Sequence, residues 1–269
     1  MTATTSTTGS PIDLGPAFPS ERTAVLTGVG SPNGIGRHTA HRLARSGWSL
    51  GLIARRTGEA QELAQEITAE YGVAALGAGV DVTRSDQIAE AAATFESELP
   101  QIVALAHFAG VSSSVTYFEI SDEEWARVMT NNLTATHLVT QAFGRIMAKN
   151  GLGRIIGLSS VTAQKGGGTF SKTAYAAAKA GIVGLMRGVA LELGPYGVTA
   201  NSVSPGPVDT DIMGGPLDDD RRDAMGAATA LGRISVPDDV SATVEFLISE
   251  GAGHITGQTL SINGGLYFH

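Results

Sequence analysis

The sequence predicts an α/β fold: a doubly wound parallel sheet of seven strands, built as a single domain. Short apolar runs alternate with longer amphipathic stretches along most of the chain, which is the pattern of parallel strands joined by crossover helices. The length of 269 residues is large for one domain but lies within the range of α/β folds. No internal repeat or low-complexity block interrupts the series, so we expect one domain over residues 21–269.

Residues 1–20 lie before the first apolar run and are rich in Thr, Ser and Pro. They have neither the basic start nor the apolar stretch of a signal peptide. We therefore expect a flexible tail.

Seven apolar runs give the expected strands, at residues 23–27, 49–54, 74–81, 102–107, 154–159, 199–204 and 259–262. Helices are expected to begin near Ile35, Gly58, Ser85, Asp122, Thr173 and Pro237. Pro237 and Asp239 together resemble a helix start. The least regular stretch, residues 211–233, lies between the sixth strand and the last helix, where we expect a substrate lid.

The first strand runs into a glycine-rich turn, Thr27-Gly-Val-Gly-Ser-Pro-Asn-Gly-Ile-Gly36, directly before a helix. Glycines let the backbone approach a pyrophosphate closely, and the helix N-terminus offers free N–H groups to it. Such a turn is also found in ordinary strand-to-helix connections. Its place after the first strand favours a dinucleotide site at Gly28, Gly34, Ile35 and Gly36.

The second strand ends in Ala54-Arg55-Arg56, where dinucleotide folds that prefer NAD usually place a carboxylate against the ribose. The sequence shows no acid at this position, and the guanidinium of Arg55 suits a 2′-phosphate. NADP is therefore the expected cofactor and NAD the less favoured one, although a surface arginine pair is otherwise simply solvated. Asp81, at the end of the third strand, could receive the adenine amino group or cap the helix that follows.

Tyr175 and Lys179 lie four residues apart on a predicted helix, so their side chains share one face. A tyrosine phenol titrates near pH ~10, and a neighbouring ammonium group favours the phenolate and lowers that pKa. Reduction of a ketone by hydride leaves an alkoxide, which needs such a proton donor. The plain alternative is two polar residues on a solvated helix face.

The motifs of this chain, taken in order, resemble those of the classical short-chain dehydrogenases/reductases, particularly the 3-oxoacyl-carrier-protein reductase-like carbonyl reductases. The motifs are the glycine-rich turn, Asp81-Val82, Ala109-Gly110, Asn132, Ser160, Tyr175, Lys179 and Pro205-Gly206. The resemblance covers about residues 22–266. It implies a Rossmann-type sheet, a nicotinamide cofactor and a catalytic tetrad of Asn132, Ser160, Tyr175 and Lys179.

The resemblance also implies what each tetrad residue does. Tyr175 donates the proton, and Lys179 keeps the phenol acidic and hydrogen-bonds the nicotinamide ribose. Ser160 is chosen over Ser159 because the family serine precedes Val in this motif, and strand alternation lets only one of the two face the site. Asn132 resembles the residue that holds a relay water for the lysine, with its neighbour Asn131 as the competing candidate.

The remaining cofactor contacts are implied by the same resemblance. They are expected at Val82, Ala109, Gly110, Pro205, Gly206, Val208 and Thr210, besides Tyr175 and Lys179. Val208 and Thr210 are the candidates for the nicotinamide carboxamide. The Pro-Gly pair alone could mark only a turn, but ligands of open α/β sheets bind at the carboxyl ends of the strands.

Three features depart from the family pattern. Five residues rather than three separate Gly28 from Gly34, which leaves open whether Ser31, Pro32 and Asn33 contact the phosphates. His107-Phe108 replaces the usual pair of asparagines, so a polar link between the central strands is lost or altered. Ser160 and Tyr175 are fifteen positions apart, more than is usual, with Lys165-Gly-Gly-Gly168 and Phe170 at the mouth of the site, which suggests an unusual substrate rim.

Two other functions are weighed against carbonyl reduction. The long turn resembles the divergent enoyl-acyl carrier reductases, but those place Lys six residues beyond Tyr, whereas four separate Tyr175 and Lys179. A cofactor-sensing protein without turnover would keep the fold alone, and the presence of all four tetrad residue types argues against it.

Composition limits the partners. A net charge of −8 and a pI near 5.2 argue against nucleic acid and anionic membranes. The chain has no cysteine, which excludes thiolate metal sites and fits a reducing, cytoplasmic location, and no metal is expected.

The expected substrate is a mainly apolar small-molecule ketone, held in a mixed pocket of apolar and hydroxyl side chains. The candidate pocket residues are Phe108, Phe170, Val111, Ser112, Ser113, Thr162 and Met213. Because Ile255-Thr-Gly-Gln and Asn263-Gly-Gly265 fit family segments that pack between subunits, a homotetramer is expected.

Overall fold

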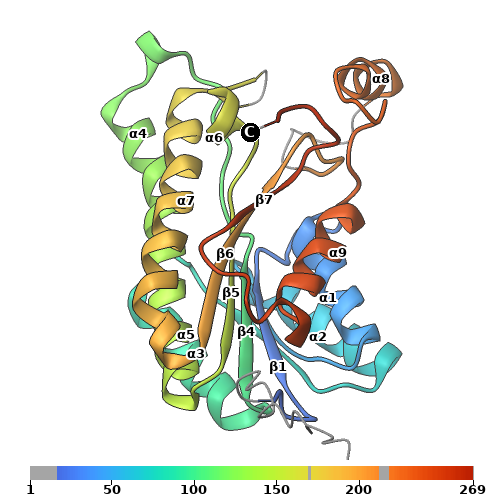
Figure 1. The fold of residues 1–269 in the computed structure, drawn as a ribbon. Coiled ribbons are helices and arrows are strands. Elements are labelled where there is room, and N and C mark those ends of the chain that lie inside the picture. The colour runs from blue at the N-terminus through green and yellow to red at the C-terminus, as the bar shows by residue number, and fades with distance from the viewer. Residues whose placement is uncertain (1–16, 169–170, 212–217, 269) are drawn as a thin grey trace, which may run out of the picture.

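The protein is a layered α/β structure in which helices cover both faces of one sheet (Figure 1). The computed structural model describes residues 17–168, 171–211 and 218–268. All seven strands run parallel, in the order β3-β2-β1-β4-β5-β6-β7. The strands are β1 (Thr23–Thr27), β2 (Ser49–Ala54), β3 (Ala75–Gly79), β4 (Ile102–His107), β5 (Gly153–Leu158), β6 (Val198–Pro205) and β7 (Thr259–Ile262).

The crossover helices divide between the two faces. One face is covered by α1 (Ile35–Arg45), α2 (Thr57–Tyr71) and α9 (Pro237–Leu247), and the other by α3 (Ser85–Glu98), α5 (Ala135–Asn150) and α7 (Thr173–Leu193) (Figure 1). The shorter helices α4 (Asp122–Met129), α6 (Thr162–Lys165) and α8 (Asp219–Ala227) lie toward the carboxyl ends of the strands. This is the Rossmann-type doubly wound fold that the sequence predicts.

Successive side chains of a strand point to opposite faces of the sheet and pack in two separate hydrophobic cores. On β1, Ala24 and Leu26 join the core beneath α1, α2 and α9, whereas Val25 joins the core beneath α3, α5 and α7. Every residue of β1, β2 and β4 is buried, as expected for strands covered on both faces. Burial of each large apolar side chain contributes roughly 1.5–3 kcal/mol, so the two cores together hold the helices against both faces of the sheet.

The strand order reverses between β1 and β4. From β1 the chain proceeds through β2 to β3 on one side, and from β4 through β5, β6 and β7 on the other. The connections on either side of this point diverge, which leaves a crevice at the carboxyl ends of the two strands. The fold therefore positions a ligand site where the glycine-rich turn leaves β1.

The predicted elements agree closely with those observed. Four of the strands have the predicted bounds, and each predicted helix start lies within one residue of the observed one. The strand predicted at 74–81 is shorter, because β3 ends at Gly79 before a turn held by Asp81. The helix predicted from Asp122 is interrupted by a π-helical turn at Thr130–Thr134, which separates α4 from α5.

Two segments with special expectations are only partly described. The predicted tail lies outside the described residues up to residue 16, and from residue 17 the chain packs on the domain. There the ring of Phe18 lies edge-on to that of Trp48, with 6.1 Å between centroids, and its N–H donates to Glu250. In the predicted lid, residues 212–217 lie outside the description, and Asp218 caps α8 by accepting a hydrogen bond from the N–H of Arg221 at 2.8 Å.

One described helix, Thr173–Tyr196, is long and apolar enough to cross a membrane by length and composition. The apolar run is not continuous, since Lys179 and Arg187 interrupt it. The helix packs its buried residues, among them Ile182 and Met186, against the sheet as part of the core. One face of the helix therefore belongs to the core, whereas most of its residues are not buried in this structure.

Candidate active site

An open cleft of about 750 Å³ lies at the carboxyl ends of the strands, where the strand order reverses. Its size is that of a small-molecule or cofactor site. Ten of the predicted cofactor residues line it, namely Gly28, Gly34, Ile35, Gly36, Arg55, Asp81, Val82, Ala109, Gly110 and Thr210. Sequence positions more than 180 residues apart are thereby brought to one surface.

The glycines of the first turn are required by close backbone approach. Gly28 has φ +72°, and a Cβ there would lie 2.7 Å from the N of Ala109. A Cβ on Gly36 would lie 2.7 Å from the O of Gly28. Gly34 is the N-cap of α1 and offers no side chain to its first N–H groups, which leaves them free for an anion.

The additional residues of the long turn contact the segment after β6. Ser31 Oγ donates to Asp211 Oδ2 at 2.5 Å, and the N–H of Asn33 donates to the same oxygen at 3.3 Å. Asn33 Nδ2 donates to the carbonyl of Asp209 at 3.1 Å. In this structure the turn is therefore linked across the cleft, and we call Ser31, Asn33, Asp209 and Asp211 the cross-cleft link.

The strand end itself carries Arg55 and Arg56, as the sequence shows, but an acid from the next helix also lines the cleft. Glu59 comes from the first turn of α2, lines the cleft and pairs with Arg56, whose Nε lies 2.7 Å from Glu59 Oε1. Its carboxylate also lies so close to the backbone of Gly30 that a Cβ there would overlap it. The signal in the sequence was an acid three residues beyond an arginine at a helix start, which places both groups on the same side of the first turn.

Asp81 stabilises the turn between β3 and α3 through hydrogen bonds with Thr83. Its carboxylate accepts hydrogen bonds from the N–H of Thr83 at 2.9 Å and from Thr83 Oγ1 at 2.7 Å. These bonds lower the pKa of Asp81. The N-cap of α3 is Arg84, so Asp81 holds the turn before the helix and does not cap it. Asp81 also lines the cleft, where the adenine function stays a prediction.

Tyr175 and Lys179 lie together on α7, with the Lys179 Nζ 5.4 Å from the centre of the Tyr175 ring. Lys179 is buried, and its ammonium donates to the carbonyl of Leu158 at 2.7 Å. Burial lowers the pKa of Lys179 to about 7. The same desolvation raises the pKa of Tyr175 to about 12, opposed by a hydrogen bond with Ser160. The direction for Tyr175 is opposite to the one expected from a neighbouring cation, because burial disfavours the phenolate.

The two serines after β5 point in opposite directions. Ser159 is buried, and its hydroxyl donates to the carbonyl of Lys179 at 2.9 Å, which ties β5 to α7. Ser160 Oγ accepts from the N–H of Thr162 at 3.1 Å, donates to Thr162 Oγ1 at 3.2 Å, and lies close enough to the phenol to lower the pKa of Tyr175. Strand alternation therefore places Ser160, and not Ser159, beside the phenol.

Asn132 lies in the π-helical turn between α4 and α5 and is fully buried. Its amide donates to the carbonyls of Val111 at 3.0 Å and Val128 at 2.8 Å, and it accepts from the N–H of Val111 at 3.3 Å. A Cβ on Gly110 would lie 2.5 Å from Asn132 Oδ1 and 3.7 Å from Lys179 Nζ. The asparagine, the lysine and the cleft floor at Gly110 thus adjoin one another.

Asn131, the competing candidate, donates its side-chain amide to the carbonyl of Arg127 at 2.8 Å and also lines the cleft. It is more exposed than Asn132. Its amide therefore stabilises the end of α4, whereas that of Asn132 faces the lysine side.

His107 forms an altered polar link between the central strands. Its Nδ1 lies 2.9 Å from Thr27 Oγ1, which also accepts the N–H groups of Phe108 and Ala109 at 3.1 and 3.2 Å. Because the threonine oxygen already accepts twice, its proton goes to Nδ1, and the imidazole proton is assigned to Nε2. Nε2 is buried without a partner among the described residues, and burial lowers the pKa of His107 to about 3.

The predicted carboxamide segment lies partly behind the cleft. Thr210 lines the cleft, and its hydroxyl donates to the carbonyl of Val208 at 3.4 Å. Val208 is buried and bridges to Ser235. Pro205 ends β6, and a Cβ on Gly206 would lie 3.0 Å from the Cα of Asn263. Thr210 is the member of this segment that lines the cleft, and cofactor contacts by Pro205, Gly206 and Val208 stay predictions.

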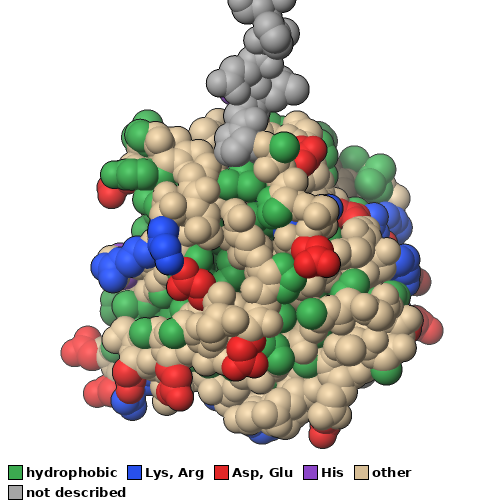
Figure 2. Space-filling view, turned by 90° about the horizontal axis from the view of Figure 1, so that it is seen from below, with side chains coloured by type: hydrophobic (Ala, Val, Ile, Leu, Met, Phe, Trp, Pro, Cys, Tyr) green, Lys and Arg blue, Asp and Glu red, His purple; other side chains and the backbone are tan. Residues whose placement is uncertain are grey.

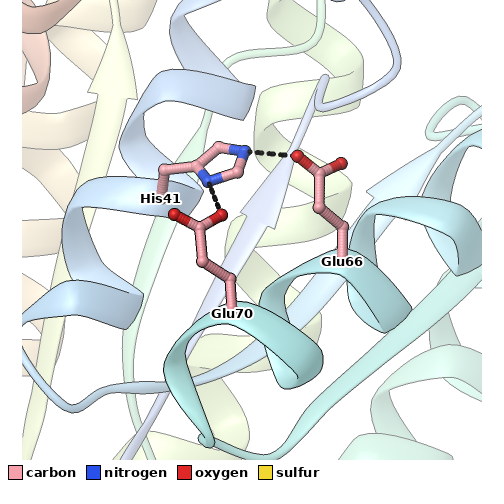
Figure 3. Close-up of side chains that lie close together, drawn as sticks. All are labelled: His41, Glu66 and Glu70. Atoms are coloured by element: carbon pink, nitrogen blue, oxygen red, sulfur yellow. Dashed lines mark ion pairs between the residues drawn. The ribbon is translucent and has the colours of Figure 1, made fainter.

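One group among the described side chains has the composition of a metal site. His41 of α1 lies between Glu66 and Glu70 of α2 (Figure 3), with Nε2–Oε1 and Nδ1–Oε2 distances of 3.3 and 3.8 Å. The two carboxylates approach different nitrogens of the ring, and Arg37 pairs with Glu66. The group therefore joins α1 to α2 through polar contacts.

Comparison with known proteins places the chain. A family model described as Enoyl-(Acyl carrier protein) reductase matches residues 28–267. The Short-chain reductase protein NovJ of Streptomyces niveus is 37% identical over 255 residues, which covers 93% of this chain and 95% of that protein. The 3-oxoacyl-(acyl-carrier-protein) reductase FabG of Aquifex aeolicus is 36% identical over 240 residues, which covers 89% of this chain and 95% of that protein. The chain belongs to the short-chain dehydrogenase/reductase family.

As a member of the short-chain dehydrogenases/reductases, the protein is an NAD(P)-dependent oxidoreductase. The residues present fit the nicotinamide dinucleotide of this family. Gly28 and Gly36 let the turn pack closely against the backbone beneath it, and the N–H groups at the start of α1, which no side chain caps, suit the charge of a pyrophosphate. The adenosine end would lie toward Arg55 and Asp81, and the nicotinamide end toward Gly110 and Thr210.

Proposed function

We propose that this enzyme catalyses the NADP-dependent, reversible reduction of a ketone to a secondary alcohol, with Tyr175 as general acid and base. The observation that carries the proposal is the group formed by Tyr175, Ser160 and Lys179, in which Lys179 adjoins Gly110 of the cleft. A hydride acceptor bound there would meet a phenol and a hydroxyl at the same oxygen.

The bound nicotinamide would supply the hydride. In the reductive direction the carbonyl carbon gains that hydride, and the carbonyl oxygen takes the phenolic proton of Tyr175. A pKa of about 12 keeps the phenol protonated at neutral pH, so it is ready to donate. Ser160 orients the same oxygen. Lys179, with a pKa of about 7, exchanges a proton with its surroundings near neutrality and can return one to the phenolate.

Preference for NADP is supported by Arg55, which lines the cleft at the end of β2. A guanidinium binds the 2′-phosphate of NADP through two parallel hydrogen bonds. NAD has no 2′-phosphate and cannot form this pair. NAD-dependent alcohol oxidation is the alternative, and a cofactor-binding protein without turnover is a further one.

The substrate class is proposed as a mainly apolar ketone, with 3-oxoacyl thioesters included because two of the relatives are named as reductases of such compounds. The family model carries the name of an enoyl reductase. The four-residue separation of Tyr175 and Lys179 favours carbonyl reduction over reduction of a carbon–carbon double bond.

The test is the oxidation of NADPH and NADH by the purified enzyme with simple ketones, a 3-oxoacyl thioester and the matching enoyl thioester. We expect turnover with ketones and a preference for NADPH. A wide preference for NADH would contradict the cofactor assignment, and turnover of the enoyl thioester alone would contradict the reaction. Chiral analysis of the alcohol then gives the face of hydride addition.

We also propose a homotetramer in the cytoplasm, without nucleic-acid or membrane partners. The charge of −8 supports the absence of nucleic acid. On the face shown in Figure 2, Lys and Arg side chains lie in separate groups near the edges, and acidic side chains are scattered between them. Such a face lacks the continuous basic patch that binds polyanions.

A further inference from the structure

The carboxylate of Glu59 lies in the cofactor cleft, between the glycine-rich turn and the end of β2. It reaches the backbone of Gly30 on one side and the guanidinium of Arg56 on the other. Its side chain is 26% exposed, against 74% for that of Arg56. The acid is therefore the more enclosed partner, held at the wall of the cleft from the first turn of α2.

Of the two arginines at the end of β2, Arg56 forms an ion pair with Glu59 and Arg55 does not. Arg56 donates through Nε and a terminal nitrogen to one oxygen of Glu59. Arg55 lines the same cleft and has no ion pair within 4.0 Å among the described residues. One guanidinium is thus committed to a carboxylate, and the other is available to a ligand.

The chemistry of these groups is opposed. A carboxylate near the end of β2 accepts hydrogen bonds from the ribose hydroxyls of NAD. The same carboxylate repels the 2′-phosphate of NADP and competes with it for a guanidinium. Glu59 thus supplies, from the helix, the acid that the strand end lacks.

We propose that Glu59 determines cofactor specificity by restraining the preference for NADP. It accepts the ribose hydroxyls of NAD, and by holding Arg56 it leaves Arg55 alone to bind a 2′-phosphate. The wild-type enzyme therefore binds both nucleotides, with a moderate preference for NADPH. This inference rests on the proposed function, since it concerns the same cleft.

The experiment measures the dissociation constants of NADPH and NADH by nucleotide fluorescence, without substrate, for the wild type and for Glu59→Gln. The substitution keeps the size of the side chain and removes its charge. We expect the ratio of the NADH to the NADPH dissociation constant to rise about tenfold, because one repulsive charge near a phosphate is lost and Arg56 is released. Glu90→Gln is the matched control, since Glu90 is an exposed acid on α3 that does not line the cleft, and its ratio should stay within twofold of the wild type.

Arg56→Gln is expected to change the ratio of the dissociation constants in the opposite direction. It gives a second test in case Glu59→Gln does not fold. It removes the cation that Glu59 holds, so the ratio should fall, and thermal unfolding of each variant checks the fold. An unchanged ratio in Glu59→Gln, with normal binding by the wild type, overturns this inference and leaves the proposed function intact. Failure of the wild type to bind either nucleotide overturns both.

Discussion

At the scale of single residues, burial decides the protonation of the site. Tyr175, Lys179 and His107 all have pKa values moved toward the neutral form by desolvation. Tyr175 and His107 are therefore neutral near pH 7, whereas Lys179 exchanges its proton near neutrality.

Replacement of Tyr175 by Phe tests the proton donor. The change removes the acidic proton and keeps most of the ring, so we expect kcat to fall by about 10²–10⁴-fold while cofactor binding is retained. Steady-state kinetics and nucleotide binding measure the two effects separately. Tyr196→Phe is the control, because Tyr196 is 55% exposed at the far end of α7. Unchanged turnover in Tyr175→Phe would refute its assigned function.

His107 should make the enzyme sensitive to acid. In the folded state its pKa is about 3, and in the unfolded chain it is about 6.5, so below pH 6.5 the unfolded state binds more protons. Stability is therefore lost as the pH falls from about 6.5 toward 3, by on the order of 2 kcal/mol at pH 5. Urea unfolding of the wild type and of His107→Asn at pH 7.5 and pH 5 measures this loss.

The His107→Asn variant should lose less stability between the two pH values than the wild type, whatever its absolute stability. His254→Asn is the matched control, since His254 is exposed. An equal loss in the wild type and in His107→Asn would show that another group titrates.

At the scale of elements, the long glycine-rich turn is hydrogen-bonded to a segment that is distant in the sequence. The cross-cleft link joins the connection between β1 and α1 to the segment after β6, across the mouth of the cofactor cleft. Asp209 is further paired with Arg222 of α8. The turn, the segment after β6 and α8 are therefore mechanically connected.

A double-mutant cycle on the free enzyme measures this connection. Ser31→Ala and Asp211→Ala each remove the same hydrogen bond, so their effects on the free energy of unfolding should not add. We expect a coupling of about 0.5–1.5 kcal/mol from urea unfolding of the two single variants and the double variant. Strictly additive losses would mean that the two side chains do not interact in solution.

At the scale of the whole molecule, the reversal of strand order defines where chemistry takes place, and the outer face of α7 defines what the monomer leaves exposed. Leu191 on α7 is 82% exposed, and the whole helix is unusually apolar. Because α7 also carries Tyr175 and Lys179, a second subunit that packs on its outer face would contact the same helix that positions these two side chains.

The chain has a mass of 27.6 kDa, so sedimentation velocity should give a species of about 110 kDa for the proposed tetramer. Leu191→Glu places a charge on the exposed face of α7 and should shift the distribution toward smaller species if that face packs between subunits. A 27.6 kDa species for the wild type at micromolar concentration would contradict the tetramer.

Much of the fold and part of the site could be predicted because the signals are local. The period of apolar residues located the strands, the glycines after β1 located the turn, and the four-residue separation located Tyr175 beside Lys179. Three features depended on tertiary structure. Glu59 reaches the cleft from a different element than the one inspected, Ser31 meets a partner 180 positions away, and burial reversed the expected pKa shift of Tyr175.

Gly110 shows how narrow the room for evolutionary change is at the centre of the site. A single methyl group there would press on the Asn132 amide and touch the surroundings of the Lys179 ammonium, at the floor of the cleft. Any replacement would disturb the cleft surface and the side chains of Asn132 and Lys179 together. A directed-evolution library should therefore leave position 110 fixed.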